Sequence, residues 1–468
     1  MERGIQYQFD GSSSSTSDAT PPEQEDLTTS RQNSSSPELG PALWAFQDLD
    51  QSMMQDYDLD APIEKLPAEL RDYILSLLDL GELKALVLAS PVYHAHYLSD
   101  RRHILARCLD ATLKTVAADA EFAYISASHE FAHIRNRLTV DTLVMDYYEW
   151  RLQSVFQCSI LKGNSTTEDI ANMVEFHLGV VQPLMQLYID WMFRNLTKQP
   201  EVNQCDRTLS PTEEIRVLRA MYRFQLGCNL FGAGLHYDCR KPHPPVESLK
   251  ILCYLSILFE PWEMEEINCI NAFAKVNYDH IFDQNVCDMG GDHLQTNDAP
   301  SLGVADLREL YDGLDPRDCL IDGTVSCGLE LLHAALFSSK RYDDLVSTLL
   351  KYIKPRHSYF LDLGISVQQQ RRLRYVSISH RDSDRRVPLP FQGELMVPNA
   401  QEKYPPMAWI LIWKGTWSNL VGAYIPDELR HWGYVLWDAA RLETTGAKEV
   451  LKRQWKMKWG DSDPRDTV

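Results

Sequence analysis

The spacing of hydrophobic residues between positions 62 and 98 predicts three short helices in succession. In the first, Leu70, Ile74, Leu77 and Leu78 recur at helical spacing, which places them on one apolar face. Pro67 is compatible with the first turn of that helix, because an N–H at this position would have no intrahelical acceptor. The stretch is therefore expected to form small amphipathic helices, each with one apolar face.

Polar residues mark where the second and third helices begin. Asp79 can cap the second helix, and Glu82 three residues later can return a hydrogen bond to the cap, the reciprocal arrangement called a capping box. Ser90 is a suitable N-cap for the third helix, with Pro91 at its first position. Both starts are thus predicted from local signals alone.

Helical periodicity continues through most of the chain after residue 99, whereas alternating strand patterns are scarce. The segment Ser210–Glu213 is a strong helix start, Gly232 is a natural C-cap, and the helix between them is expected to bury one apolar face. Pro261 precedes the acidic stretch Glu263–Glu266, which fits a helix N-terminus whose macrodipole favours anions. We find no fixed-period repeat, and the fold is expected to be mainly α.

Composition divides the chain into four parts. Residues 1–60 form a Ser-, Pro- and Gln-rich tail that is expected to be disordered, because it cannot bury enough apolar surface to offset chain entropy. Residues 61–105 are the three-helix module. Residues 106–445 are a large helical body that could recruit a substrate, with a polar loop near 365–405. Residues 446–468 are expected to be a basic and then polar tail.

Tryptophans are concentrated after residue 405. Those at positions 409, 413, 417, 432 and 437 are interpreted as core, since regularly spaced aromatic side chains usually pack inside. Trp455 and Trp459 fall in the basic C-terminal segment and are not assigned to the core.

The string LPAELRDYILSLLDLGELKALVLASPVYHAHY, residues 66–97, resembles an F-box. An F-box is a three-helix module that docks a protein onto the Skp adaptor and cullin of an SCF ubiquitin ligase. The Leu-Pro-x-Glu-Leu start and Ala89-Ser90 fall where the family pattern has them, whereas Tyr93 replaces the usual tryptophan. The residues that the resemblance implies as contacts of the Skp adaptor are Leu66, Pro67, Leu70, Ile74, Leu75, Leu78, Leu83 and Leu86.

Three segments of the body, 215–232, 259–267 and 432–438, resemble uncharacterised F-box proteins of filamentous fungi, and this second resemblance spans most of residues 62–445. Together the resemblances imply a non-enzymatic adaptor that recruits an unidentified protein substrate for ubiquitination through protein–protein interaction. The alternative is a helical scaffold whose F-box-like helices are ordinary core and dock no ligase.

Charge and cysteine usage bear on the expected partners and the expected cellular compartment. With 46 basic and 66 acidic residues the formal net charge is −20, which repels phosphate backbones, so nucleic-acid binding is not expected. The ten cysteines are scattered without a Cys-x-x-Cys pair, as in proteins with reduced thiols. No signal sequence is evident, and the apolar runs are too short to cross a membrane. We expect a soluble cytoplasmic or nuclear protein.

A basic island interrupts this acidic chain. Arginine forks bind carboxylate or phosphate groups bidentately, so the island is a candidate site for an acidic or phosphorylated partner. Alternatives are an exposed basic loop, a nuclear-localisation patch or a nucleic-acid contact. Its members are Arg371, Arg372, Arg374, Arg381, Arg385 and Arg386.

No residue set gives a convincing catalytic or cofactor site, and no cofactor is predicted. Cys228, His236, Cys239 and His243 could form a zinc set, but the close paired spacing of structural zinc sites is missing, and Cys228 is equally explained as a buried helix residue. The His129-Glu130 pair is interpreted as an isolated pair that lacks the second histidine of a zinc-protease helix. We therefore expect no enzyme activity.

Overall fold

Helices account for nearly all regular structure in the computed structural model. It describes residues 61–153, 165–203, 206–232, 248–289, 316–338, 386–394 and 404–467, all within one compact unit, Leu49–Val468. Within these ranges the only extended pairing is an isolated antiparallel bridge between Pro388 and Thr416, so the predicted mainly helical fold is confirmed. The tail predicted over 1–60 and most of the loop predicted near 365–405 lie outside the described residues.

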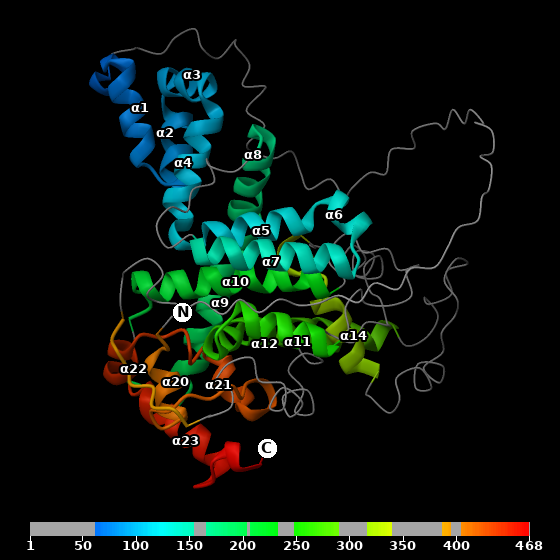
Figure 1. Ribbon diagram of the computed structural model, residues 1–468. Coiled ribbons are helices and arrows are strands. Elements are labelled where there is room, and N and C mark those ends of the chain that lie inside the picture. Colours follow the sequence, from blue (N-terminus) through cyan, green and yellow to red (C-terminus); the bar gives the residue numbers. More distant parts are fainter. Residues whose placement is uncertain are drawn as a thin grey trace, which may run out of the picture. The chain divides into compact units, whose positions relative to one another are not determined.

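The module begins with a 3₁₀ turn and three helices at the predicted places (Figure 1): η2 (Pro62–Lys65), α1 (Ala68–Leu77), α2 (Leu80–Ala89) and α3 (Pro91–Ser99). The capping box of Asp79 and Glu82 is present at the start of α2, and the Ser90 side chain accepts a hydrogen bond from the Tyr93 N–H at the start of α3. Pro67 is the N-cap of α1 rather than its first residue. The local signals thus set the helix starts to within one residue.

Helix α4 (Arg101–Leu113) completes the module and connects it to the body. Tyr93 is fully buried, and its hydroxyl donates to the Ile63 carbonyl at 3.3 Å. The Leu80 N–H donates to the Thr112 hydroxyl at 3.1 Å, which joins α2 to α4. Other buried residues of the module are Leu75, Leu80, Leu83, Val87 and Tyr97. The three short helices therefore share one core with α4.

The body is organised around one helix, α10, which lies between α5 on one side and α12 on the other (Figure 1). The helices before it are α5 (Ala117–Ala127), α6 (His129–Ile134), α7 (Arg137–Gln153), α8 (Thr167–Phe176), the π-helical segment η5 (His177–Val181) and α9 (Gln182–Thr197). From α10 (Pro211–Phe231) the chain continues into α11 (Ser248–Leu258), α12 (Pro261–Met289), α14 (Pro316–Val325), α15 (Leu329–His333) and the π-helical segment η6 (Ala334–Ser338).

Helix α10 is buried on all sides. The predicted capping box of Ser210 and Glu213 is present, and Gly232 ends the helix. Gly232 has an extended backbone, and a Cβ there would lie 2.7 Å from the Ser326 carbonyl oxygen, so glycine is required by close approach rather than by a left-handed turn. The face predicted to be buried is buried, and the burial extends around the whole helix, because every residue of Thr212–Phe231 except Glu214 is buried.

The C-terminal region packs its tryptophans inside, as predicted. Its elements are α20 (Met407–Ile412), η7 (Gly422–Tyr424), α21 (Asp427–His431), α22 (Ala439–Thr445), α23 (Ala447–Trp459) and η8 (Pro464–Thr467). The predicted core tryptophans are all buried: Trp409, Trp413, Trp417, Trp432 and Trp437.

The segment expected to be a basic tail instead forms α23. Val450, Leu451 and Trp455 lie on one face of this helix and are buried, and the Trp455 ring meets the Trp413 ring edge-on with centroids 5.3 Å apart. The Lys and Arg residues between them obscured this stripe in the sequence. Among the described residues, no helix has both the length and the apolar character needed to cross a bilayer.

A backbone conformation rare for L-residues connects α4 to the body. Lys114, in the turn η3 (Lys114–Val116), has φ 52° and ψ −121°, and its side chain is exposed. Glycine adopts this region readily, whereas a residue with a Cβ is strained there. The turn between α4 and α5 therefore stores strain that the surrounding helices hold in place.

We expect Lys114→Gly to stabilise the protein by about 1 kcal/mol, because it relieves the Cβ strain at this turn. Urea unfolding followed by circular dichroism measures the change. Lys452→Gly, within the regular helix α23, is the matched control and should cost about 1 kcal/mol. Destabilisation by both substitutions would contradict the inferred strain.

Candidate functional site

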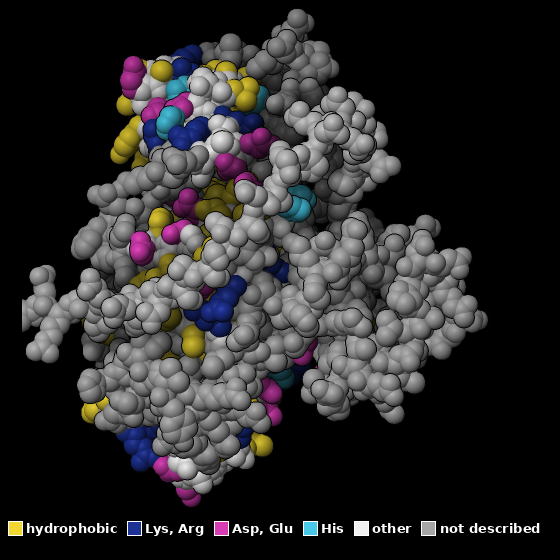
Figure 2. Space-filling model, turned by 45° about the vertical axis from the view of Figure 1, so that its right-hand side comes forward, with side chains coloured by type: hydrophobic (Ala, Val, Ile, Leu, Met, Phe, Trp, Pro, Cys, Tyr) yellow, Lys and Arg dark blue, Asp and Glu magenta, His cyan; other side chains and the backbone are white. Residues whose placement is uncertain are grey.

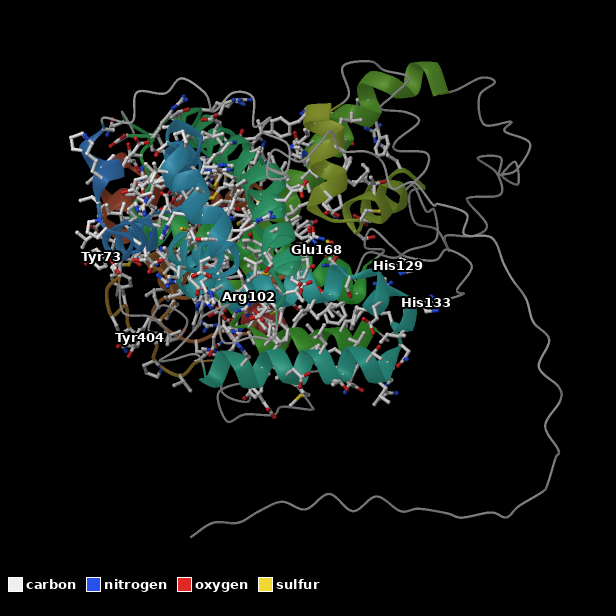
Figure 3. The ribbon with its side chains drawn as sticks, turned by 90° about the horizontal axis from the view of Figure 1, so that it is seen from above. Tyr73, Arg102, His129, His133, Glu168 and Tyr404 are labelled. Carbon is white, nitrogen blue, oxygen red and sulfur yellow. The ribbon has the colours of Figure 1, made fainter. Side chains whose placement is uncertain are left out.

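The module exposes a row of large apolar side chains on α1. Leu70, Tyr73 and Leu77 are 49%, 61% and 63% exposed, and their spacing of three and four residues places them along one helix face. We call these three residues the α1 stripe. Tyr73 lies at the outer edge of the ribbon in Figure 3, and the upper part of Figure 2 shows hydrophobic side chains at the surface of the module among charged ones.

The structure separates the predicted contact residues into two groups. Leu75 and Leu83 are 0% and 1% exposed, so they are core residues of the module rather than contacts of a partner. Pro67 and Leu70 are exposed, and the half-buried members are Leu66, Ile74, Leu78 and Leu86. Tyr73 and Leu77 were not predicted as contact residues. The sequence did contain a sign of their exposure, because α1 carries more apolar residues than fit on one buried face.

Contacts behind this surface fix the module's outer parts. The Ser90 hydroxyl donates to the Glu64 carboxylate, which ties η2 to the start of α3. Arg107 of α4 pairs with Asp72 of α1 at 3.4 Å, and the Cys108 thiol donates to the Leu75 carbonyl at 3.4 Å. Contacts with α4 therefore hold α1, the helix that carries the α1 stripe, in place.

A cluster of charged residues lies inside the body, where α10 packs against α12. The Arg219 guanidinium donates to both oxygens of Glu266, with its shortest contact at 2.7 Å. Arg223 donates to Asp119 of α5 at 2.7 Å and to Glu263 at 2.5 Å. All of these side chains are at most 4% exposed.

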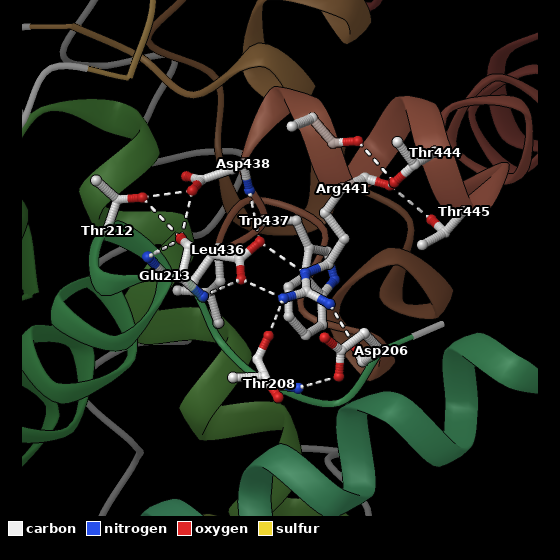
Figure 4. A network of polar contacts seen from close by, with 12 residues as sticks. Asp206, Thr208, Thr212, Glu213, Leu436, Trp437, Asp438, Arg441, Thr444 and Thr445 are labelled. Carbon is white, nitrogen blue, oxygen red and sulfur yellow. Dashed lines mark hydrogen bonds and ion pairs between the residues drawn. The ribbon is translucent and has the colours of Figure 1, made fainter. Parts of the chain in front are cut away.

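The same pattern continues toward the C-terminal region. Arg430 of α21 binds both oxygens of Glu265 at 2.9 and 3.1 Å, and Arg216 of α10 binds Asp438 at 2.9 Å. Figure 4 shows the next pair, in which the Arg441 fork contacts Glu213 at 2.7 and 2.6 Å. Glu263, Glu265 and Glu266 lie in the first turns of α12, as the sequence predicted, and they are also buried partners of arginines.

The pKa values follow this pairing. Burial alone would raise the pKa of Glu263, but the nearby Arg223 and Arg151 cations lower it to about 2. Burial raises the pKa of Glu266, and Arg219 offsets that rise only in part. The carboxylates of Glu263 and Glu266 are each paired with guanidinium groups, an arrangement typical of a structural ion-pair network.

The spacing of arginines in the sequence could have indicated that α10 carries buried ion pairs. Arg216, Arg219 and Arg223 recur every three or four residues within the stretch 215–224, whose other residues are apolar or aromatic. Charged residues at core positions need partners, so a complementary acidic helix could have been expected. Which acidic helix it was could not be derived, because the partners are distant in the chain.

The other predicted sites are described only in part. Cys228 is buried, burial raises the pKa of its thiol, and the thiol contacts the Val325 carbonyl at 3.7 Å. His236, Cys239 and His243 lie outside the described residues, as does the basic island except for Arg386, which pairs with Asp466. Within the described residues, no group of three or more His, Cys, Asp or Glu is placed to hold a metal ion.

The interpretation of His129-Glu130 as an isolated pair was wrong. His133 completes the pattern His-Glu-x-x-His over residues 129–133, which lies on α6. Both histidines are exposed, and their ring centroids are 6.4 Å apart.

The chain matches no protein-family model, no curated protein and no solved structure at a significant level. The resemblances to F-box proteins therefore stay predictions.

We expect Arg219→Met to lower the free energy of unfolding by about 3–5 kcal/mol, because it leaves the buried Glu266 carboxylate without its cation. The double variant Arg219→Met/Glu266→Leu should recover most of this loss. Lys448→Met, which removes a half-exposed pair with Glu443, should cost about 1 kcal/mol or less. Denaturant unfolding measures all three, and a double variant as unstable as the single one would contradict the pairing argument.

A carboxyl group at the α4–α5 junction should make stability depend on pH. Burial and the neighbouring Asp110 raise the pKa of Glu121 from 4.5 to about 7. The folded state thus favours the protonated acid, and the stability linked to this group is complete below about pH 4.5 and lost as the pH rises through 7. Glu121→Gln should therefore be more stable than the parent at pH 8 and similar at pH 4.5, as measured by thermal unfolding. An equal difference at both pH values would contradict this assignment.

Proposed function

We propose that this protein is an F-box-type adaptor. In this proposal, the module docks the Skp adaptor of an SCF ubiquitin ligase, and the helical body recruits a protein substrate. The observation that carries the proposal is the exposed α1 stripe on a module whose sequence resembles an F-box over residues 66–97.

Exposed apolar side chains in a row favour a protein partner. Leaving them in water forgoes the free energy of burial, about 25 cal/mol for each Å² of apolar surface. Positions i, i+3 and i+7 on an amphipathic helix are also the usual anchors for packing into an apolar groove. The α1 stripe has this spacing, so a complementary apolar groove on a partner would bury all three side chains together.

The same observation bears on the alternative, in which the module is merely part of the core. That alternative expects the apolar residues of α1 to be covered by the body. Leu75 is covered, but the α1 stripe is about half exposed or more. The exposure therefore favours docking over a purely internal role.

An adaptor of this type needs no catalytic residues of its own, since the ligase that it joins transfers ubiquitin. The buried arginine–glutamate pairs fit such a role, because they hold the body's helices in a fixed arrangement without leaving a reactive group open.

The test compares the full-length chain with a variant in which Leu70, Tyr73 and Leu77 are all serine, using purified Skp adaptor as the probe. We expect the variant to bind at least about tenfold more weakly, because truncated anchor residues at an interface commonly cost more than 1 kcal/mol each. Co-purification and a binding titration measure the change, and circular dichroism checks that the fold is intact.

The matched control replaces Leu138 and Met145 with serine. These residues are 73% and 46% exposed on α7 and have the same seven-residue spacing as Leu70 and Leu77. The control should bind the Skp adaptor like the parent. Failure of the parent chain to bind, or equal binding by the α1-stripe variant, would exclude the proposed docking face.

A further inference from the structure

A histidine pair on α6 is not used by the proposed adaptor function. His129 and His133 are four residues apart, so they project from the same face of the helix, and both are exposed. Figure 3 shows the two rings at the outer end of α6, directed away from the ribbon. Glu130 follows the first histidine and is also exposed. This is the residue pattern of helices that bind zinc through two imidazoles.

The turn that carries the pair is fixed at both ends. The Ser128 side chain caps α6 by accepting a hydrogen bond from the Phe131 N–H at 3.1 Å. Phe131, between the two histidines in sequence, is 8% exposed and anchors the inner face of the helix. Just after the helix, the Arg135 guanidinium donates to the Asn229 carbonyl of α10 at 2.5 Å. The backbone under the pair is therefore held in place although α6 has only six residues.

Both rings have to rotate before their nitrogens can bind one metal ion. The two imidazole planes are 9° from parallel, with centroids 6.4 Å apart. Two ring nitrogens bound to one tetrahedral zinc ion lie about 3.3 Å from each other, since each Zn–N bond is about 2.0–2.1 Å. Side-chain rotation can supply this approach, because both rings are at the surface and their shared backbone turn does not have to move.

We propose that His129 and His133 form a binding site for a zinc-class divalent cation. The two neutral imidazoles supply two ligands on one helix face. Among the described residues, no group of three or more His, Cys, Asp or Glu is placed to hold a metal ion, so this part of the chain supplies the two imidazoles and leaves the other coordination positions open. In the His-Glu-x-x-His pattern, the glutamate acts on the water that the metal binds, and Glu130 occupies that position. The site is a metal-binding site with open positions.

The test titrates zinc chloride into the tag-free, full-length protein in competition with a chromophoric chelator. His129→Ala and His133→Ala should each weaken the tightest binding by at least about tenfold, because one imidazole alone is a poor chelator. The control is His103→Ala. His103 is also exposed on a helix, but it pairs with Asp100 at 2.6 Å and has Ser99 and Arg107 four residues away on either side. This variant should bind zinc like the parent.

Chemical modification locates the metal independently of affinity. Diethyl pyrocarbonate labels exposed imidazoles, and peptide mass spectrometry reads each position. Zinc should protect His129 and His133 together and leave His103 reactive. Equal zinc affinity in the parent and both variants, or labelling of His129 and His133 that zinc does not change, would overturn the proposal. Neither result depends on whether the α1 stripe binds the Skp adaptor.

Discussion

The arrangement of the body depends on pairing the charges that α10 carries into the interior. Arg216, Arg219 and Arg223 are all buried, and leaving any one of them without a carboxylate would cost several kcal/mol. Their partners come from α5, α12 and the start of α22. A shift of any of these helices by one turn would break a pair. The ion pairs thus select one register among the many that apolar packing alone would tolerate.

The module is held together mainly by apolar packing rather than by buried ion pairs. Its short helices contribute a few apolar residues each, and α4 supplies the surface that covers them. Contacts such as the Leu80 N–H with Thr112 and the Cys108 thiol with the Leu75 carbonyl join the two parts. Helix α4 leads into the strained turn at Lys114 and also packs against α8, so the surface that we assign to a partner is linked to the body through α4.

Local features were predictable from sequence, and long-range pairings were not. The capping boxes of Asp79 and Ser210 require only neighbouring residues, so both were found in advance. The role of Glu265 depends on Arg430, 165 residues later, and no local pattern contains that information. In the module, the spacing of apolar residues predicted the three helices correctly. It did not tell Leu75, which is core, from Leu77, which is exposed, because α1 carries apolar residues on both faces.

The position of α10's partners has a consequence for synthesis on the ribosome. Glu213 and Arg216 are made early, but Arg441 and Asp438 lie 228 and 222 residues downstream of them. Until that C-terminal segment leaves the exit tunnel, the start of α10 holds charges that cannot be satisfied by the chain made so far. The start of this helix therefore stays hydrated until late in translation, whereas the partners of Arg219 and Arg223 are made much earlier.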